Sequence, residues 1–280
     1  MRILITGAQG QLGRAVVLEA LRRGHEAIGV DVNDFDLTDS DAAGACLAAA
    51  RPAFVIHCAA YTAVDQAESE PERAFAVNAD GTRHVAEYCG AAGIGMIYIS
   101  TDYVFDGSGA APHETDEPPA PLSVYGKTKL EGERAALLAC PNGIIVRTSW
   151  VFGPGGKHFV GTMLRLGRER EAVRVVDDQV GSPTYAPDLA RLLIDMAERP
   201  VPGIYHAANT GYCSWAEFAA EIMARAGLPC RVEPISSADY PQAARRPLNS
   251  RLSPLRLMAA GYDRLPTWQD ALGRYLYGTK

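Results

Sequence analysis

The sequence predicts an α/β protein with a doubly wound parallel sheet and a smaller, irregular C-terminal part. Short, continuous apolar runs alternate with helical patterns for most of the 280 residues, and such runs suit strands buried on both faces of a parallel sheet. The first run leads directly into a glycine-rich turn, and the alternation loosens after Trp150. These observations predict right-handed βαβ crossovers, with ligands bound beyond the carboxyl ends of the strands.

The expected elements follow one another in a regular order. Strands are expected at residues 2–6, 27–31, 54–59, 96–101, 144–148, 173–176 and 203–207. Helical patterns separate them at residues 14–23, 38–50, 71–92, 124–138, 187–198 and 215–226. Glycine, proline and aromatic residues gather at 151–156 and around 181–187, which indicates a region rich in loops.

A glycine-rich turn follows the first expected strand, with Gly7, Gly10 and Gly13 spaced as Gly-x-x-Gly-x-x-Gly. Such a turn lets a pyrophosphate approach the backbone, and the next helix offers free N–H groups at its N-terminus. Asp31 ends the second expected strand 24 residues after Gly7, near the offset of a carboxylate that binds the adenosine ribose. The turn predicts a dinucleotide cofactor, and Asp31 favours NADH over NADPH. The alternatives are a turn without a ligand and an Asp31 that only ends its strand or caps a turn.

The loosening of the alternation after Trp150 divides the chain into two predicted domains. Residues 1–150 are interpreted as a Rossmann-type dinucleotide-binding domain. Residues 151–280 are expected to form mainly a substrate-binding domain, with segments at about 173–200 crossing back to the Rossmann sheet. Polar stretches follow the ends of several expected strands. Because the carboxyl ends of parallel strands meet at one edge of the sheet, these stretches are expected to line one crevice.

Composition excludes several classes of partner and site. The net charge of −6 argues against a general binder of nucleic acid or anionic membranes. No run of 18 apolar residues occurs and the first strand begins at Arg2, so we expect a cytoplasmic protein without a signal peptide or membrane anchor. The six cysteines and the histidines show no metal-ligand spacing, so the cysteines are interpreted as reduced packing residues and no histidine is assigned to the chemistry.

Tyr125 and Lys129 lie four residues apart on an expected helix, downstream of Ser100-Thr101-Asp102. Positions i and i+4 share one helix face, so the Lys129 ammonium is expected beside the Tyr125 phenol. A nearby cation lowers the pKa of a phenol from its free value of about 10. The pair therefore predicts proton transfer during hydride chemistry on a carbonyl or alcohol. The alternative is a lysine whose stem packs beside a half-buried ring.

Seven stretches spread over the chain carry a family resemblance: residues 7–13, 59–65, 100–107, 125–129, 147–152, 177–184 and 246–252. The whole chain resembles the extended short-chain dehydrogenase/reductases and, within them, the family of dTDP-4-dehydrorhamnose reductases. The glycine and Tyr-Lys motifs belong to the whole superfamily, whereas the other stretches are more specific to this family. The resemblance implies reduction of the C4 keto group of dTDP-4-dehydro-β-L-rhamnose by NADH or NADPH, which gives dTDP-L-rhamnose for surface polysaccharide.

The resemblance also implies roles for individual residues. Tyr125 would donate the proton, Thr101 would hydrogen-bond the reacting oxygen or the phenol, and Lys129 would contact the nicotinamide ribose. The cofactor-binding residues implied by the two motifs, the offset and the resemblance are Gly7, Gly10, Gln11, Leu12, Gly13, Asp31, Asp36, Leu37, Ala60, Tyr61, Thr62, Tyr125 and Lys129. The implied substrate-binding residues are Thr101, Asp102, Tyr103, Trp150 and Arg251.

Several of these residues also have a purely structural interpretation. Trp150 could be a core aromatic residue, and Thr101 and Asp102 could cap the next turn. Asn78 could satisfy backbone groups inside a helix, although the superfamily offers it a place in a proton relay. Arg251 is chosen from an arginine cluster with Arg245 and Arg246, any member of which could be a solvated surface residue.

The chain departs from its relatives at one position. Some family members join subunits through magnesium held by carboxylates, including a glutamate soon after the glycine motif, where this chain has Ala15. We therefore expect no metal, and either a monomer or a homodimer. Two other functions stay open, namely reduction of another dTDP-4-keto-6-deoxysugar, of the talose or dihydrostreptose type, and a non-catalytic regulatory subunit that binds a dinucleotide.

Overall fold

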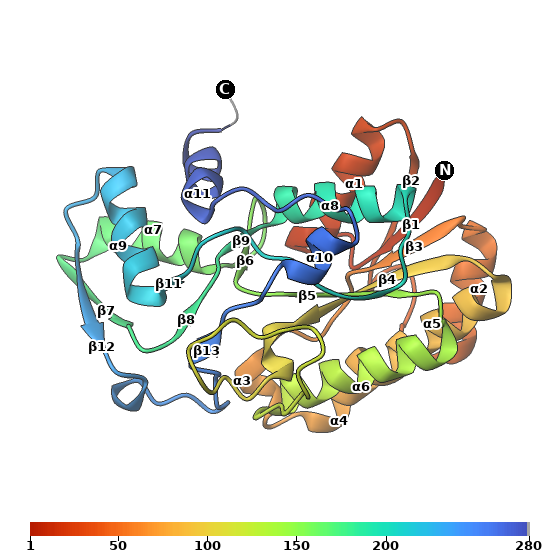
Figure 1. The fold of residues 1–280 in the computed structure, drawn as a ribbon, viewed down its shortest axis with the longest axis horizontal. Coiled ribbons are helices and arrows are strands. Elements are labelled where there is room, and N and C mark those ends of the chain that lie inside the picture. The colour runs from red at the N-terminus through yellow and green to blue at the C-terminus, as the bar shows by residue number, and fades with distance from the viewer. Residues whose placement is uncertain (279–280) are drawn as a thin grey trace.

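The computed structural model describes residues 1–278 and contains a six-stranded parallel sheet in the order β10-β5-β4-β3-β1-β2 (Figure 1). Its strands are β1 (Arg2–Thr6), β2 (Glu26–Val30), β3 (Phe54–His57), β4 (Gly95–Thr101), β5 (Ile144–Thr148) and β10 (Gly203–His206). The predicted doubly wound α/β fold is confirmed. The order reverses between β1 and β3, so the carboxyl ends of these strands flank the crevice in which such folds bind ligands.

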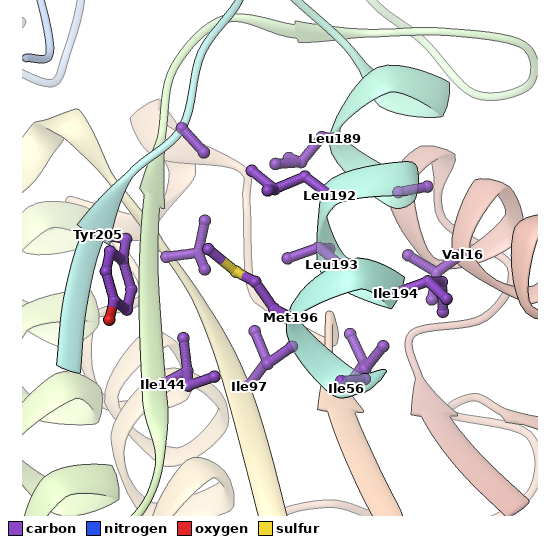
Figure 2. Close-up of a cluster of buried hydrophobic side chains, with 14 of the residues drawn as sticks. Val16, Ile56, Ile97, Ile144, Leu189, Leu192, Leu193, Ile194, Met196 and Tyr205 are labelled. Carbon is purple, nitrogen blue, oxygen red and sulfur yellow. The ribbon is translucent and has the colours of Figure 1, made fainter. Parts of the chain in front are cut away.

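Helices cover both faces of this sheet (Figure 1). One face carries α1 (Gln11–Arg22) and α8 (Ala186–Glu198), and the other carries α2 (Ser40–Ala50), α5 (Gly81–Ala92) and α6 (Val124–Ala139). Alternation along β1 explains this, because Ile3 and Ile5 pack in the core with α1 and α8 whereas Leu4 packs in the core with α2 and α5. Figure 2 shows α8 directing Leu189, Leu193 and Met196 onto the sheet.

The helix predicted at residues 71–92 is one continuous path with an irregular middle. It consists of α4 (Pro71–Phe75), a π-helical stretch η1 (Ala76–Asp80) and α5. The short helix α3 (Val64–Ala67) precedes it. A π-helical stretch widens the helix locally, and such stretches occur often at functional sites. Here it carries Asn78, which is fully buried.

The C-terminal half adds a smaller part at one side of the large sheet (Figure 1), and this part has its own hydrophobic core. Its helices are α7 (Phe159–Glu169), α9 (Trp215–Ala226) and α11 (Trp268–Tyr277), and its small sheets consist of β7 (Ala172–Val176) with β12 (Arg231–Ile235), β6 (Val151–Phe152) with β9 (Thr184–Tyr185), and β8 (Val180–Gly181) between β11 (Cys213–Ser214) and β13 (Asn249–Ser250). The remaining short elements are η2 (Asp102–Val104), η3 (Ser237–Asp239) and α10 (Leu255–Ala259).

The return of the chain to the large sheet begins later than the sequence predicts. The segment expected to cross back from residue 173 instead forms β7, which pairs with β12 in the small part. The return starts with α8, which packs on the sheet, and ends with β10, which pairs with β5. A short run such as Ala172–Val176, which is apolar except for the exposed Arg174, does not specify its partner strand, because the same pattern suits more than one parallel pairing. Among residues 1–278, no helix is both long enough and apolar enough to span a membrane.

Candidate active site

The glycine turn between β1 and α1 is closed by backbone contacts that leave no room for side chains. Gly7 has a φ of +66°, and a Cβ atom there would lie 2.7 Å from the backbone nitrogen of Ala59. A Cβ atom on Gly13 would lie 2.1 Å from the Gly7 carbonyl oxygen. Gly10 begins α1 without a side-chain cap, so the first N–H groups of this helix stay available to an anion. The turn therefore fits a dinucleotide pyrophosphate.

Asp31 lies beside this turn, directly after β2. Its carboxylate accepts hydrogen bonds from the backbone N–H groups of Gln9 and Val32, both at 2.8 Å. It is therefore fixed next to the glycine turn, where a ribose hydroxyl could reach it. Further along the same loop, Asp36 accepts hydrogen bonds from the backbone and the hydroxyl of Thr38, which lower the pKa of its carboxyl.

Asn78 holds the segment that follows β3. Its side-chain oxygen accepts a hydrogen bond from the backbone of Tyr61 at 2.8 Å, and its amide donates to the Tyr61 carbonyl and to the Thr128 hydroxyl. The residues predicted to lie along the cofactor, Ala60, Tyr61 and Thr62, are thus tied to the helix that carries Tyr125 and Lys129. The interpretation of Asn78 as a residue that satisfies backbone groups is confirmed, but those groups belong to a neighbouring loop.

Thr101 and Tyr125 lie together at the carboxyl end of β4, and Lys129 follows Tyr125 by one turn of α6. Thr101 is the last residue of β4, and its hydroxyl lies close enough to Tyr125 to lower the pKa of the phenol. The same hydroxyl donates a hydrogen bond to the Asp102 carboxylate at 3.1 Å and accepts one from the Tyr103 backbone. Tyr125 and Lys129 occupy the first turns of α6, which Ser123 caps by accepting a hydrogen bond from the backbone of Gly126. A side chain at Gly126 would collide with the Tyr103 carbonyl, so this glycine lets α6 approach the end of β4.

The expected depression of the Tyr125 pKa is wrong for this structure. Burial raises the pKa of the phenol above its usual value, Thr101 lowers it, and the nearby Asp102 carboxylate raises it again. Desolvation disfavours the phenolate more strongly than the hydrogen bond from Thr101 favours it. Tyr125 therefore remains a protonated phenol at neutral pH, which is the form that a proton donor needs.

Lys129 is almost completely buried, and its ammonium lies over the Tyr98 ring at 4.1 Å from the centroid. Burial lowers the pKa of its ammonium to about 7, whereas the Glu133 carboxylate opposes this shift. The charge of Lys129 is therefore finely balanced near neutral pH. The sequence located this lysine correctly, but the Glu133 charge that it depends on was not identified, although its spacing of four residues from Lys129 is visible in the sequence.

Asp102 is a buried carboxyl next to Thr101. Burial raises the pKa of its carboxyl to about 6, while the nearby Ser250 and the Thr101 hydroxyl, which donates to Oδ1 at 3.1 Å, lower it. One of its oxygens, Oδ2, has no hydrogen-bond partner among the described residues. An unpartnered buried oxygen is costly unless a ligand satisfies it. Asp102 is therefore suited to accept a hydrogen bond from a bound hydroxyl group.

An ion pair joins the C-terminal segment to the short helix α3. Arg246 donates two hydrogen bonds to the Asp65 carboxylate, at 2.9 and 2.7 Å, across 181 residues of sequence. Arg246 also lies near Tyr103, whose ring packs edge-on against the Tyr125 ring with centroids 5.5 Å apart. Tyr103 thus lies between the candidate proton donor and this ion pair. The pairing with Asp65 was not predicted, since nothing local in the sequence links the two residues.

Two of the predicted substrate residues make contacts within the small part. Trp150 has a φ of +49°, and its ring stacks on Trp215 with centroids 3.6 Å apart. The structure therefore adds Trp215, which begins α9, as the neighbour that covers one face of Trp150. Arg251 donates a hydrogen bond to the Asn249 side chain at 2.9 Å and lies over the Tyr212 ring.

The parallel sheet, the glycine turn, the Thr-Tyr-Lys group and the buried carboxyl define the class of dinucleotide-dependent reductases with a Rossmann-type fold. The family model described as the RmlD substrate binding domain matches residues 1–279. The chain belongs to this family.

Relatives with stated activities resemble the chain over nearly its full length. A dTDP-4-dehydrorhamnose reductase of Streptomyces griseus is 45% identical, over 97% of this chain and 91% of its own length. A Streptomyces antibioticus protein named "Probable dTDP-4,6-dihydroxy-2-methyloxan-3-one 4-ketoreductase" is 39% identical, over 97% of this chain and 93% of its own length. The crystal structure of dTDP-4-dehydrorhamnose reductase from Bacillus anthracis in complex with NADP is 40% identical, with a TM-score of 0.97 and 99% coverage of both chains.

Proposed function

We propose that this protein reduces the C4 keto group of dTDP-4-dehydro-β-L-rhamnose to dTDP-L-rhamnose with NADH or NADPH. The observation that carries the proposal is that Tyr125 lies close to Thr101 at the carboxyl end of β4, with Lys129 one turn further along α6. The prediction of a sugar-nucleotide reductase is confirmed by relatives named dTDP-4-dehydrorhamnose reductase, which are 45% identical to this chain over nearly its full length.

The chain's own residues divide the work of proton transfer. When bound, a nicotinamide cofactor supplies the hydride. Tyr125 then protonates the oxygen that develops negative charge at C4, because burial keeps its phenol protonated until that charge appears. Thr101 hydrogen-bonds to the phenol and stabilises the phenolate that remains. Lys129 stabilises the same phenolate with its positive charge and holds the ribose next to the nicotinamide.

In this proposal the cofactor lies along the carboxyl ends of β1, β2 and β3. Its pyrophosphate meets the glycine turn and the start of α1, with Gly7, Gly10, Gln11, Leu12 and Gly13. Asp31 receives the adenosine ribose, Asp36 and Leu37 flank the adenine, and Ala60, Tyr61 and Thr62 lie along the nicotinamide half. Asp31 supports NADH, whereas the Bacillus anthracis relative was crystallised with NADP, so both cofactors belong to the proposal.

The sugar nucleotide is proposed to lie between this cofactor and the small part. Thr101 and Asp102 contact the sugar, and the free Asp102 oxygen supports this assignment. Tyr103 and Trp150 line the same cleft, and Arg251 binds the diphosphate. A monomer or homodimer and a cytoplasmic location are part of the same proposal. The six cysteines are free thiols, which suits a reducing compartment.

A second candidate keeps the chemistry and changes the sugar. The relative from Streptomyces antibioticus carries a different dTDP-sugar ketoreductase name at 39% identity, so the family includes more than one named substrate. The non-catalytic alternative lacks a comparable observation, because a protein that only binds a dinucleotide does not need a proton donor next to a buried lysine.

Cofactor oxidation by the purified protein tests the proposal. We expect turnover of freshly generated dTDP-4-dehydro-β-L-rhamnose with NADH or NADPH, and formation of dTDP-L-rhamnose. Tyr125→Phe is expected to lower kcat by about a hundredfold or more with little change in dinucleotide affinity. Tyr88→Phe on α5 is the matched control, since it removes a phenol hydroxyl away from the Thr-Tyr-Lys group.

Each outcome of this assay has a distinct meaning. Equal rates for Tyr125→Phe and the wild type would show that another group donates the proton. Binding of dinucleotide without turnover of this sugar, but with turnover of another dTDP-4-keto-6-deoxysugar, would identify the second candidate. Binding without turnover of any of them would support the regulatory alternative.

A further inference from the structure

The catalytic helix carries a further titratable side chain in line with Tyr125 and Lys129. Glu133 follows Lys129 by four residues, so the three side chains share one face of α6. Glu133 is as buried as Lys129, with 2% of each residue exposed. A carboxylate is rarely buried to this degree unless it is paired.

Glu133 is paired with a residue of the neighbouring strand. Arg147 of β5 donates two hydrogen bonds to the Glu133 carboxylate, at 2.8 and 2.7 Å, and is itself 2% exposed. Ser100 of β4 donates a third hydrogen bond to Glu133 at 2.5 Å. Ser100 immediately precedes Thr101 in the sequence. The carboxylate of Glu133 therefore joins α6 to the ends of β4 and β5, directly beneath the Thr-Tyr-Lys group.

The other titratable groups around Lys129 are neutral near pH 7. Burial and the Lys129 charge lower the pKa of His57 to about 3, and burial raises the pKa of the Cys58 thiol to about 12. Burial raises the pKa of Tyr98 well above its usual value, and that of Tyr125 as well. Among the described residues that influence the Lys129 pKa, Glu133 thus supplies the ionised carboxylate that favours the ammonium.

We propose that Glu133, held by Arg147 and Ser100, is a positioning residue for the reaction: it places a buried counter-charge one helical turn from Lys129, and its hydrogen bonds fix α6 against the end of β4 next to Thr101. The inference rests on the proposed function for its catalytic meaning. Stability alone gives a weak reason for such a pair, because the desolvation of two buried ions often offsets their attraction. A charge that opposes the desolvation of Lys129 gives the pair a chemical role.

Opposite charge changes in the pair make the test specific. Glu133→Gln removes the negative charge and leaves Arg147, so the Lys129 pKa is expected to fall by about one unit or more. Arg147→Gln leaves Glu133 without its counter-charge, so the Lys129 pKa is expected to rise. A pair with only a structural role would lose stability in both variants without opposite shifts of the Lys129 pKa.

NMR titration of the free protein, labelled with ¹³C at lysine Cε, measures these shifts without substrate. Lysine occurs at four positions of the sequence, 127, 129, 157 and 280, so Lys129→Met suffices to assign the Lys129 signal. The double variant Glu133→Gln, Arg147→Gln leaves no unpaired buried charge from this pair, so it serves if either single variant fails to fold. It is expected to lower the Lys129 pKa. An unchanged pKa, or shifts in the same direction for both single variants, would overturn the proposal.

The pH profile of kcat/KM then connects the charge to catalysis. Loss of the Lys129 proton defines an activity limb that falls as pH rises, and Glu133→Gln is expected to move this limb to lower pH by the shift measured with NMR. Glu133→Asp retains the charge and is expected to leave the limb near its wild-type position. If the high-pH limb of kcat/KM stays in place although the Lys129 pKa moves, the proposed role of Glu133 in catalysis is refuted. Failure of the proposed substrate to react would leave the NMR result intact, so the two failures are distinguishable.

Discussion

Replacing Gly13 by alanine is expected to open the glycine turn, although alanine is normally the better residue in a helix. Gly13 lies in the first turn of α1, and an added Cβ would lie 2.1 Å from the Gly7 carbonyl oxygen and 2.7 Å from the Gly7 carbonyl carbon. These are backbone atoms, so no flexible side chain can give way. Restoring an ordinary contact requires a movement of about 1 Å in a closely packed turn.

The cost follows from overpacking. Inserting a methyl group into a filled site costs about 1–3 kcal/mol, which exceeds the roughly 0.5–1 kcal/mol that alanine gains over glycine in a helix. Gly44→Ala in α2 is the matched control, because a Cβ at Gly44 meets no atom within 4 Å. We therefore expect Gly13→Ala to lower and Gly44→Ala to raise the free energy of unfolding.

Urea unfolding and dinucleotide titration measure the two consequences. The urea midpoint of Gly13→Ala should fall with an unchanged m-value. Because the added methyl group opens the turn that binds the pyrophosphate, dinucleotide affinity should fall by about tenfold, the equivalent of 1.4 kcal/mol. Gly44→Ala should leave dinucleotide affinity unchanged. Wild-type stability together with wild-type affinity for Gly13→Ala would refute the argument that this turn excludes a side chain.

Two further predictions concern carboxylates of the site. Asp31→Asn keeps an acceptor for the Gln9 N–H group but removes the charge, so the ratio of kcat/KM for NADPH to that for NADH should rise by about tenfold; an unchanged ratio would mean that Asp31 does not face the ribose. Asp102 has a pKa of about 6 against an ordinary 3.8, so the native state binds more protons than the unfolded state between these values, and its ionisation destabilises the fold as pH rises through 6. Asp102→Asn should therefore stabilise the protein at pH 7, by at most about 3 kcal/mol, and this gain should disappear near pH 4. The variant should also lose activity. Urea midpoints that show the same difference from the wild type at both pH values would contradict this prediction.

The sequence predicted the elements of the large sheet because their information is local. Each strand there is a short apolar run followed by polar residues, and each helix has its own start signal or periodicity. The exceptions are instructive. The run that forms β7 has the pattern of a Rossmann strand but pairs with β12, and η1 interrupts a helix whose sequence pattern is continuous. Both depend on partners that are remote in the sequence.

The candidate site shows the same division. The glycine turn and the Tyr125–Lys129 spacing were visible in the sequence, because turns and helix faces are set by residues a few positions apart. The pKa of Tyr125 was predicted in the wrong direction, since the sequence shows the neighbouring cation but not the burial that outweighs it. The Arg246–Asp65 pair and the Trp150–Trp215 stack were missed because each joins residues that are far apart in the sequence.

The sequence by itself thus determined the α/β class, the dinucleotide turn and the residues that form the catalytic helix face. The tertiary structure alone decided how strongly each of them is desolvated and which charge stands next to it. Glu133 and Arg147 illustrate the difference, because they lie on separate elements and meet only when α6 packs across β4 and β5. Desolvation and Coulomb energy depend on three-dimensional distance and burial, so the protonation state of Lys129 is a property of the fold.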